Sequence, residues 1–183
     1  MRSLQAQYLR RLTFSSDELS VLKKIGEYKG KQELFQHQTP EILESLKKIA
    51  IIESTKCSNR IEGVTAPDER IEALVLHSTT PQNRSEQEIA GYRDALDVIH
   101  ESAPHMTLSS NVILQLHSTI YRYMSDSGGH WKLADNEIVE KSADGIIRRV
   151  RFKAVGAVET PQAVEDLAQG YKAAIHEYEP LVV

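Results

Sequence analysis

Apolar residues recur at helical spacing through most of this chain. The first stripe, within residues 19–25, follows Ser15-Ser16-Asp17-Glu18. That tetrapeptide is typical of a capping box, in which a Ser hydroxyl and a Glu carboxylate satisfy free backbone amides at the start of a helix. We therefore predict a helix beginning here, although Gly26 and Gly30 weaken its later part.

A second helix is predicted to begin at Thr39-Pro40, because proline is favoured at the first helical position. Nothing interrupts it before Gly63, so residues 40–62 form either one long helix or two stacked ones. Gly63 would supply the left-handed turn that ends it, which places Glu62 in the last turn. The stripe expected on this helix contains Ile42, Leu46 and Ile49.

Three more helices follow from the same pattern. One starts at Thr65-Ala66-Pro67-Asp68 and ends in the loop at 78–83, and its inward residues are Ile71, Leu74 and Val75. The next has Ser85 and Glu88 as a second capping box and stops before Pro104, with apolar residues Ile89, Tyr92, Leu96 and Ile99. The third spans about 107–124 and is expected to bury Val112, Ile113, Leu116 and Ile120.

From Gly128 onward the pattern changes from helical to alternating. Residues 136–141 and 146–152 read as two strands around Asp144-Gly145, a strong hairpin signal. Two strands alone are marginal, so the hairpin must pack on the helices or pair with another chain. A last helix opens at Thr160-Pro161, with Val164, Leu167, Tyr171, Ile175 and Tyr178 on its apolar side. The apolar end, residues 179–183, is typical of a further buried helix, so we expect the chain to stop within a domain.

These patterns predict a mostly α-helical fold with one β-hairpin. Three segments are expected: an N-terminal helical extension at 1–38, a pair of helices at 39–78, and a core at 84–183 with the hairpin at about 132–152. The 183 residues suffice for one core.

Composition excludes several classes. The net charge of −4 does not favour a nucleic-acid-binding surface. A single cysteine, Cys57, rules out an internal disulfide, and the start of the chain has no signal-peptide core, so a cytoplasmic location is expected. The apolar runs are too short to span a membrane. The seven histidines and one cysteine form no metal-ligand spacing, so we expect no bound metal.

The chemically most informative segment is Ser58-Asn59-Arg60-Ile61-Glu62-Gly63, within residues 51–63. It resembles the inhibitory helix of Fic-family AMP-transferases, whose signature is Ser or Thr, three residues, Glu, and then Gly or Asn. The resemblance implies an inhibitory role for Ser58, Glu62 and Gly63. Glu62 would pair with an arginine of the catalytic loop and occupy the place of the ATP γ-phosphate, which makes it the nucleotide-binding residue. Without the resemblance, Glu62 would be read as a solvated side chain.

Further segments resemble the same family in order and spacing. They are Tyr92-Arg93-Asp94-Ala95-Leu96, Leu116-His117-Ser118-Thr119-Ile120 and Gly129-His130-Trp131-Lys132. The resemblance covers roughly residues 50–183 and implies a Fic-type helical bundle, incomplete at its C-terminus, whose hairpin is the flap that docks a target protein. Flap candidates are Lys132, Asn136, Ile138, Arg148, Arg149 and Arg151. The basic residues could steer an acidic target, or could simply deter edge-to-edge aggregation.

The family's catalytic loop, His-Pro-Phe followed by an acidic residue and Gly-Asn-Gly-Arg, does not occur in the sequence. We therefore assign no catalytic residue, and His117 and His176 are not substitutes. The resemblance implies the regulatory and scaffolding part of a protein adenylyltransferase, inactive alone, whose complete form uses ATP and Mg²⁺ to modify a Ser, Thr or Tyr hydroxyl. This chain alone is expected to bind neither. Self-modification and a homodimer remain open. The alternative is a catalytically dead module that presents the inhibitory helix or the hairpin edge to a partner.

Overall fold

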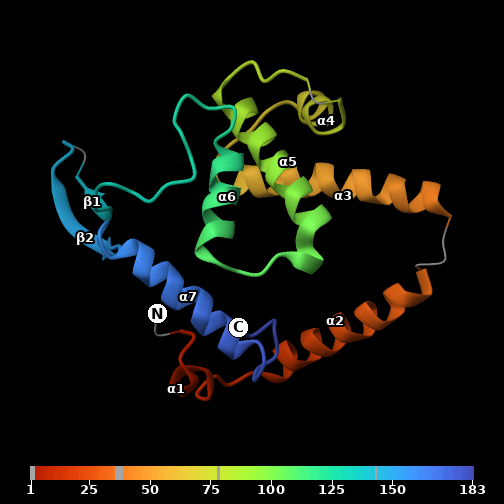
Figure 1. Ribbon diagram of the computed structural model, residues 1–183, viewed down its shortest axis with the longest axis horizontal. Coiled ribbons are helices and arrows are strands. Elements are labelled where there is room, and N and C mark those ends of the chain that lie inside the picture. Colours follow the sequence, from red (N-terminus) through yellow and green to blue (C-terminus); the bar gives the residue numbers. More distant parts are fainter. Residues whose placement is uncertain (1–2, 36–38, 78, 143) are drawn as a thin grey trace.

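The computed structural model describes residues 3–35, 39–77, 79–142 and 144–183. Within them the chain is mostly helical with one two-stranded antiparallel sheet, which confirms the predicted class (Figure 1). Ser78, in the predicted loop at 78–83, and Ala143, in the predicted hairpin turn, lie outside these residues. The elements are α1 (Ala6–Leu9), α2 (Ser16–Phe35), α3 (Pro40–Ile61), α4 (Asp68–His77), α5 (Arg84–Ser102), the 3-10 helix η1 (Ala103–His105), α6 (Ser110–Ile120), β1 (Glu137–Lys141), β2 (Ile147–Lys153) and α7 (Thr160–Ala174).

The first two long helices begin as predicted. The Ser15 backbone N–H donates to the Glu18 carboxylate at 2.7 Å, and the Glu18 N–H donates back to Ser15 Oγ at 3.2 Å, which is a complete capping box. α2 continues through Gly26 and Gly30, because a glycine costs only about 1 kcal/mol relative to alanine in a helix. The region predicted as one or two helices is the single helix α3.

The hydrophobic core lies between α4 and α5. Ile71 and Leu74 of α4 pack against Ile89 and Ala90 of α5, and all four side chains are buried. α5 is the central element, since it packs against α3, α4 and α6 (Figure 1). Most other predicted inward residues are only partly covered, and the stripes of α2 and of the first half of α3 are exposed.

The start of α5 differs from the prediction. Asn83, not Ser85, is the N-cap, because its side-chain oxygen accepts from the Glu86 N–H at 3.0 Å. Glu88, the expected capping partner of Ser85, pairs instead with Arg84 at 3.0 Å, one turn away. The amide side chain of Asn83 thus begins the helix two residues earlier than a Ser85 cap would.

α6 is shorter than predicted and less buried. Its N-cap is Ser109, whose hydroxyl accepts from the Val112 N–H at 3.3 Å, and the helix ends at Ile120. Beyond Ile120 the chain continues in turns to Asp126. The apolar residues predicted to be buried on this helix, Val112, Ile113, Leu116 and Ile120, are all half-buried.

α5 and α6 approach each other closely at Gly91. A Cβ atom placed on Gly91 would lie 1.9 Å from the backbone oxygen of Ile120. No backbone oxygen tolerates a carbon at that distance, so only glycine permits this spacing of the two helices.

The hairpin forms as predicted. β1 pairs with β2 in antiparallel register, and bulges follow Ile138 and Glu140. Gly145 has a φ of 82°, and its N–H donates to the Ser142 carbonyl at 2.8 Å to close the turn. Ile138 lies opposite Phe152, and these side chains are 63% and 60% exposed. The helices therefore leave this apolar pair uncovered.

A buried ion pair joins α4 to the start of α5. Arg70 donates to both carboxylate oxygens of Glu86, at 3.1 and 2.6 Å, and the Gln82 N–H donates to the same carboxylate at 2.9 Å. Glu86 is 2% exposed. The hydrogen bonds from Arg70 hold the pKa of Glu86 below its usual value, against the opposing effect of burial.

We predict that Gly91→Ala lowers the free energy of unfolding by about 2–3 kcal/mol or more, because the new methyl group would collide with rigid backbone. Gly26→Ala is the matched control, since nothing lies within 4 Å of a Cβ there and the site is helical. It should stabilise the protein by about 0.5–1 kcal/mol. Urea denaturation of both variants measures the difference; equal effects would show that the two helices are free to separate.

We also predict a pH dependence from Glu86. Because its folded pKa is depressed, its stabilising contribution is complete above the unfolded value of about 4.3 and is lost as the pH falls through the folded pKa. Glu86→Gln should be less stable than the wild type at pH 7. The difference in free energy of unfolding between the two should narrow on acidification. Denaturation at several pH values tests this, with Glu88→Gln at the more exposed Arg84 pair as control. A stability difference that stays constant with pH would rule out the charge of Glu86 as its cause.

Candidate functional site

The C-terminal end of α3 is fixed by a Schellman motif. The Gly63 N–H donates to the Arg60 carbonyl at 3.0 Å, and the Val64 N–H donates to the Asn59 carbonyl at 2.9 Å. Gly63 has a φ of 77°, as the motif requires, which confirms the predicted left-handed turn. Val64 packs against the core between α4 and α5. The last turn of α3 is therefore anchored to the hydrophobic core.

Glu62 is the C-cap residue of this helix, and its side chain is exposed. Asn59, by contrast, is buried, and its amide donates to the Thr55 carbonyl at 2.8 Å. Ser58 is half-buried and lies one turn before Glu62 on the same face. Within the described ranges the Glu62 carboxylate has no hydrogen bond or ion pair. Since the helix dipole is negative here, Glu62 would be stabilised by an incoming cation.

The start of α4 holds the same region in place from the other side. Lys56, in α3, donates to the Asp68 carboxylate at the first residue of α4. This hydrogen bond raises the pKa of Lys56 above its usual value. Lys56 is thus held by Asp68, and it forms no ion pair with Glu62.

The six flap candidates divide into two groups. Lys132 donates to the Val155 carbonyl, and Arg151 donates to Glu140 across the hairpin at 3.0 Å, so both brace the hairpin itself. The Asn136 carbonyl accepts from the Ala154 N–H at 3.2 Å. The other three side chains, Ile138, Arg148 and Arg149, are exposed. Among described residues, no hydrogen bond or ion pair connects the hairpin to Ser58, Glu62 or Gly63.

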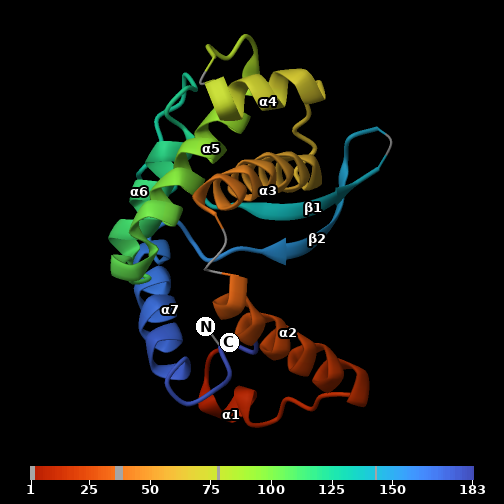
Figure 2. The same cartoon turned by 90° about the vertical axis from the view of Figure 1, so that its right-hand side faces the viewer.

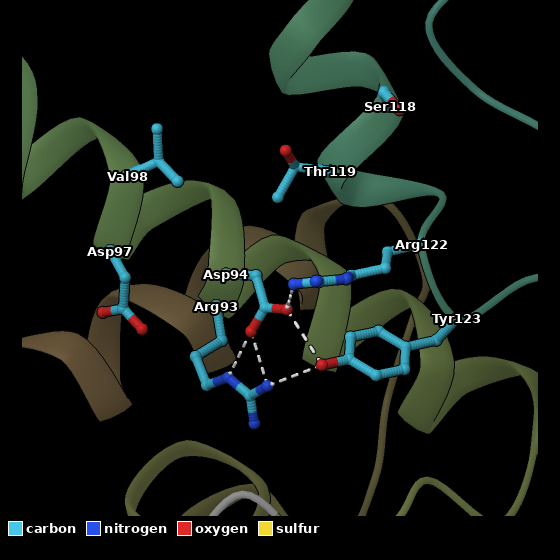
Figure 3. A pocket seen from close by; sticks show the side chains of 8 residues that line it. All are labelled: Arg93, Asp94, Asp97, Val98, Ser118, Thr119, Arg122 and Tyr123. Carbon is cyan, nitrogen blue, oxygen red and sulfur yellow. Dashed lines mark hydrogen bonds and ion pairs between the residues drawn. The ribbon is translucent and has the colours of Figure 1, made fainter.

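A polar cleft of about 560 Å³ lies between α5 and the end of α6. Figure 3 shows Arg93, Arg122 and Tyr123 converging on Asp94. Arg93 Nε donates to Asp94 at 2.9 Å, and the Tyr123 hydroxyl donates to Asp94 at 2.9 Å. Burial, followed by the hydrogen bond to Asp94, raises the pKa of Tyr123. The sequence pattern assigns no role to this cluster, because charged residues are common along α5 and give no sign that Arg93 and Asp94 are the buried ones.

The contacts of this cluster are those of a structural brace. Arg93 is 6% exposed and donates to the Leu74 carbonyl at the end of α4 as well as to Tyr123 at 3.2 Å. Its guanidinium therefore ties α4, α5 and the turn after α6 together. His117 is also structural, because its Nδ1 accepts from the Gly129 N–H at 3.2 Å and its ring meets Tyr121 edge-on.

Metal-ligand clusters and membrane-spanning helices are both missing from the described residues. In the part of the chain that the structure describes, no group of three or more His, Cys, Asp or Glu side chains is placed to hold a metal ion. In the same ranges, no helix combines the length and apolar character that crossing a bilayer requires.

Comparison with known proteins adds no family assignment: no family model matches the sequence, and no curated protein matches it as a relative.

We predict that Gly63→Ala destabilises the protein by about 1–2 kcal/mol. A Cβ at Gly63 has open space, so the whole cost comes from the positive φ. Gly63→Asn is the matched variant, because Asn adopts the left-handed conformation more readily than Ala does. Its free energy of unfolding should fall by clearly less than that of Gly63→Ala. Thermal unfolding of the two variants measures the difference. A loss as large for Asn as for Ala would mean that Gly63 is needed for another reason.

Proposed function

We propose that this chain is the regulatory and scaffolding part of a Fic-type protein adenylyltransferase, with Glu62 as its inhibitory residue. The main support is the position of Glu62, an exposed carboxylate at the end of α3 whose backbone is held by the Gly63 turn and by Val64 in the core. An inhibitory carboxylate must be both rigidly placed and free to meet a cation. Glu62 meets both requirements.

The chemistry of inhibition follows from charge. An arginine that should bind the ATP γ-phosphate would be neutralised by Glu62, and the carboxylate would repel the phosphate from the same place. Like charges about 4 Å apart repel strongly when water is partly excluded, which corresponds to a rate effect on the order of tenfold to a thousandfold. The catalytic loop, which would supply that arginine and the general base, does not occur in these 183 residues.

The hairpin is proposed as the target-docking element of the same protein. Its exposed cross-strand pair, Ile138 and Phe152, offers apolar contact beside an unpaired strand edge. The exposed guanidinium groups of Arg148 and Arg149 add positive charge to the second strand. A target segment could therefore be held as an added strand, with its hydroxyl presented to the catalytic loop.

We predict that Glu62→Ala raises the rate of AMP transfer by tenfold to about a thousandfold, in a protein that joins this chain to the catalytic loop. Removing the carboxylate frees the arginine for the γ-phosphate. Incorporation of labelled AMP from ATP measures the rate. Glu53→Ala is the matched control, because Glu53 is also exposed on α3 but lies on the opposite side of the helix, and it should leave the rate unchanged.

Equal rates for the wild type and Glu62→Ala would refute the inhibitory role. Activation by Glu53→Ala as well would point to a general loosening of α3 rather than to one carboxylate. An absence of AMP transfer in every variant would favour the alternative, a binding module that presents α3 or the hairpin to a partner.

A further inference from the structure

The chain between α6 and the hairpin lies directly against α6. We name residues 125–135 the connector, and Figures 1 and 2 show it as part of a loop beside α6. A Cβ atom placed on Gly128 would lie 2.5 Å from the backbone oxygen of His117. A Cβ atom on Gly129 would lie 2.9 Å from the Cβ of Ser118. The connector therefore meets α6 through its backbone, at a distance that leaves no room for side chains.

One hydrogen bond fastens the connector to this helix. The Gly129 N–H donates to Nδ1 of His117 at 3.2 Å. Among the described residues, it is the only hydrogen bond that the connector makes to α6. Two other connector side chains, Lys132 and Asp135, bind the chain between β2 and α7 instead. The attachment of the connector to α6 thus depends on one imidazole nitrogen.

This hydrogen bond also requires a neutral ring. A backbone N–H can only donate, so Nδ1 of His117 must be the acceptor and must carry no proton. A proton added to Nδ1 would place one N–H group against another. An imidazole in water takes up its proton near pH 6.5, within the range that cells reach. We propose that His117 is an acid-sensitive latch, which holds the connector on α6 while its ring is neutral and releases it when the ring is protonated.

Two aromatic side chains face the His117 ring. Tyr121, one turn later on α6, meets it edge-on with the ring centres 4.6 Å apart. His130, on the connector itself, is 6.4 Å away between ring centres. In acid a protonated His130 would add a like charge near His117, and this repulsion would favour release of the connector. Neither side chain supplies a negative charge at neutral pH.

The charged groups on the surrounding elements have other partners. On α5, Glu88 pairs with Arg84 at 3.0 Å, and Asp126 of the connector also acts on this arginine. On α7, Glu165 accepts a hydrogen bond from Ser110, at the start of α6, at 2.9 Å. Within the described ranges none of these carboxylates bonds to the imidazole of α6. A proton taken up there would therefore gain no ion-pair partner in exchange for the lost hydrogen bond.

Opening of the latch would loosen the hairpin from the helices. In the part of the chain that the structure describes, no hydrogen bond or ion pair joins β1 or β2 to a helix, and Figure 1 shows the hairpin to one side of them. Lys132 and Asp135 would still tie the connector to the chain after β2, so the two legs of the hairpin would move together. This inference does not depend on the proposed enzymatic role, because it uses only the contact of the connector with α6.

Hydrogen exchange of the folded protein, followed by NMR, tests the latch. The signal of the ring Cε1–H reports the titration of His117, and exchange is measured above and below its midpoint. After correction for the intrinsic pH dependence of exchange, protection of the Gly129 amide should fall by about tenfold or more below the midpoint. The Ala95 amide, inside α5, should keep its protection. A Gly129 amide that stays protected when the ring is charged overturns the inference.

The chain also contains a fluorescent reporter for the same event. Trp131 is the one tryptophan of the sequence, and it lies two residues after Gly129. Its side chain is half-buried. Quenching by acrylamide should therefore increase as the connector leaves α6, over the same pH range in which the Gly129 amide loses protection. Quenching that does not change with pH would contradict release of the connector.

His117→Asn separates the latch from a merely structural role. The Asn side-chain oxygen can accept the Gly129 N–H, as Nδ1 does, but it takes up no proton. This variant should keep the Gly129 amide protected at both pH values, whereas His117→Phe, which has no acceptor, should leave it unprotected at both. A loss of protection in acid as large for His117→Asn as for the wild type would show that another group releases the connector, and would overturn the inference.

His130→Asn is the matched control. His130 is exposed, and among the described residues it makes no hydrogen bond. The variant should keep the pH-dependent loss of Gly129 protection, with its midpoint moved only by the loss of one neighbouring charge. Loss of the pH dependence in His130→Asn, together with its persistence in His117→Asn, would assign the switch to His130 and overturn the proposal.

Discussion

The contact between Gly91 and the Ile120 carbonyl sets the distance between α5 and α6, the pair of helices on which α3, α4 and α7 pack. α5 packs on three helices, α3, α4 and α6, so any change in its position would reach all of them. Because Gly91 has no side chain, the backbones of α5 and α6 touch directly. The two helices can therefore shift less than they could across an interface of flexible side chains. The end of α3, and therefore Glu62, is positioned by its packing on α4 and α5.

Polar braces supplement a small apolar core. Besides the apolar cluster of Ile71, Leu74, Ile89 and Ala90, the described structure relies on Glu86 with Arg70 and on Arg93 with Asp94 and Tyr123. Each brace crosses from one helix to another, and each charged group has its hydrogen-bond partners. Such networks give directional constraints that apolar contacts alone do not give. They hold the region around α4 and α5 in register, while α2 and the start of α3 contribute little to the core.

Local signals in the sequence were sufficient for much of this fold. The Ser15 capping box, the proline starts of α3 and α7, the Gly63 turn and the Asp144-Gly145 hairpin are all interactions between residues close in the chain. Errors arose where two local signals competed, as between Asn83 and Ser85. A stripe predicts an amphipathic helix but does not say what covers it, as on α2 and α3. The interhelical role of Gly91 and the Arg93 cluster needed the three-dimensional structure, because their partners are distant in sequence.

The unbroken course of α3 has a mechanical consequence. With 22 residues, this helix is about 33 Å long, and its hydrogen-bonded backbone resists twisting. A tilt imposed at Pro40 about the buried Thr55 would reach Glu62 at about half its size, because fifteen residues separate Pro40 from Thr55 and seven separate Thr55 from Glu62. α3 is therefore a rigid rod that links an exposed apolar stripe near Pro40 to the Glu62 carboxylate at its other end.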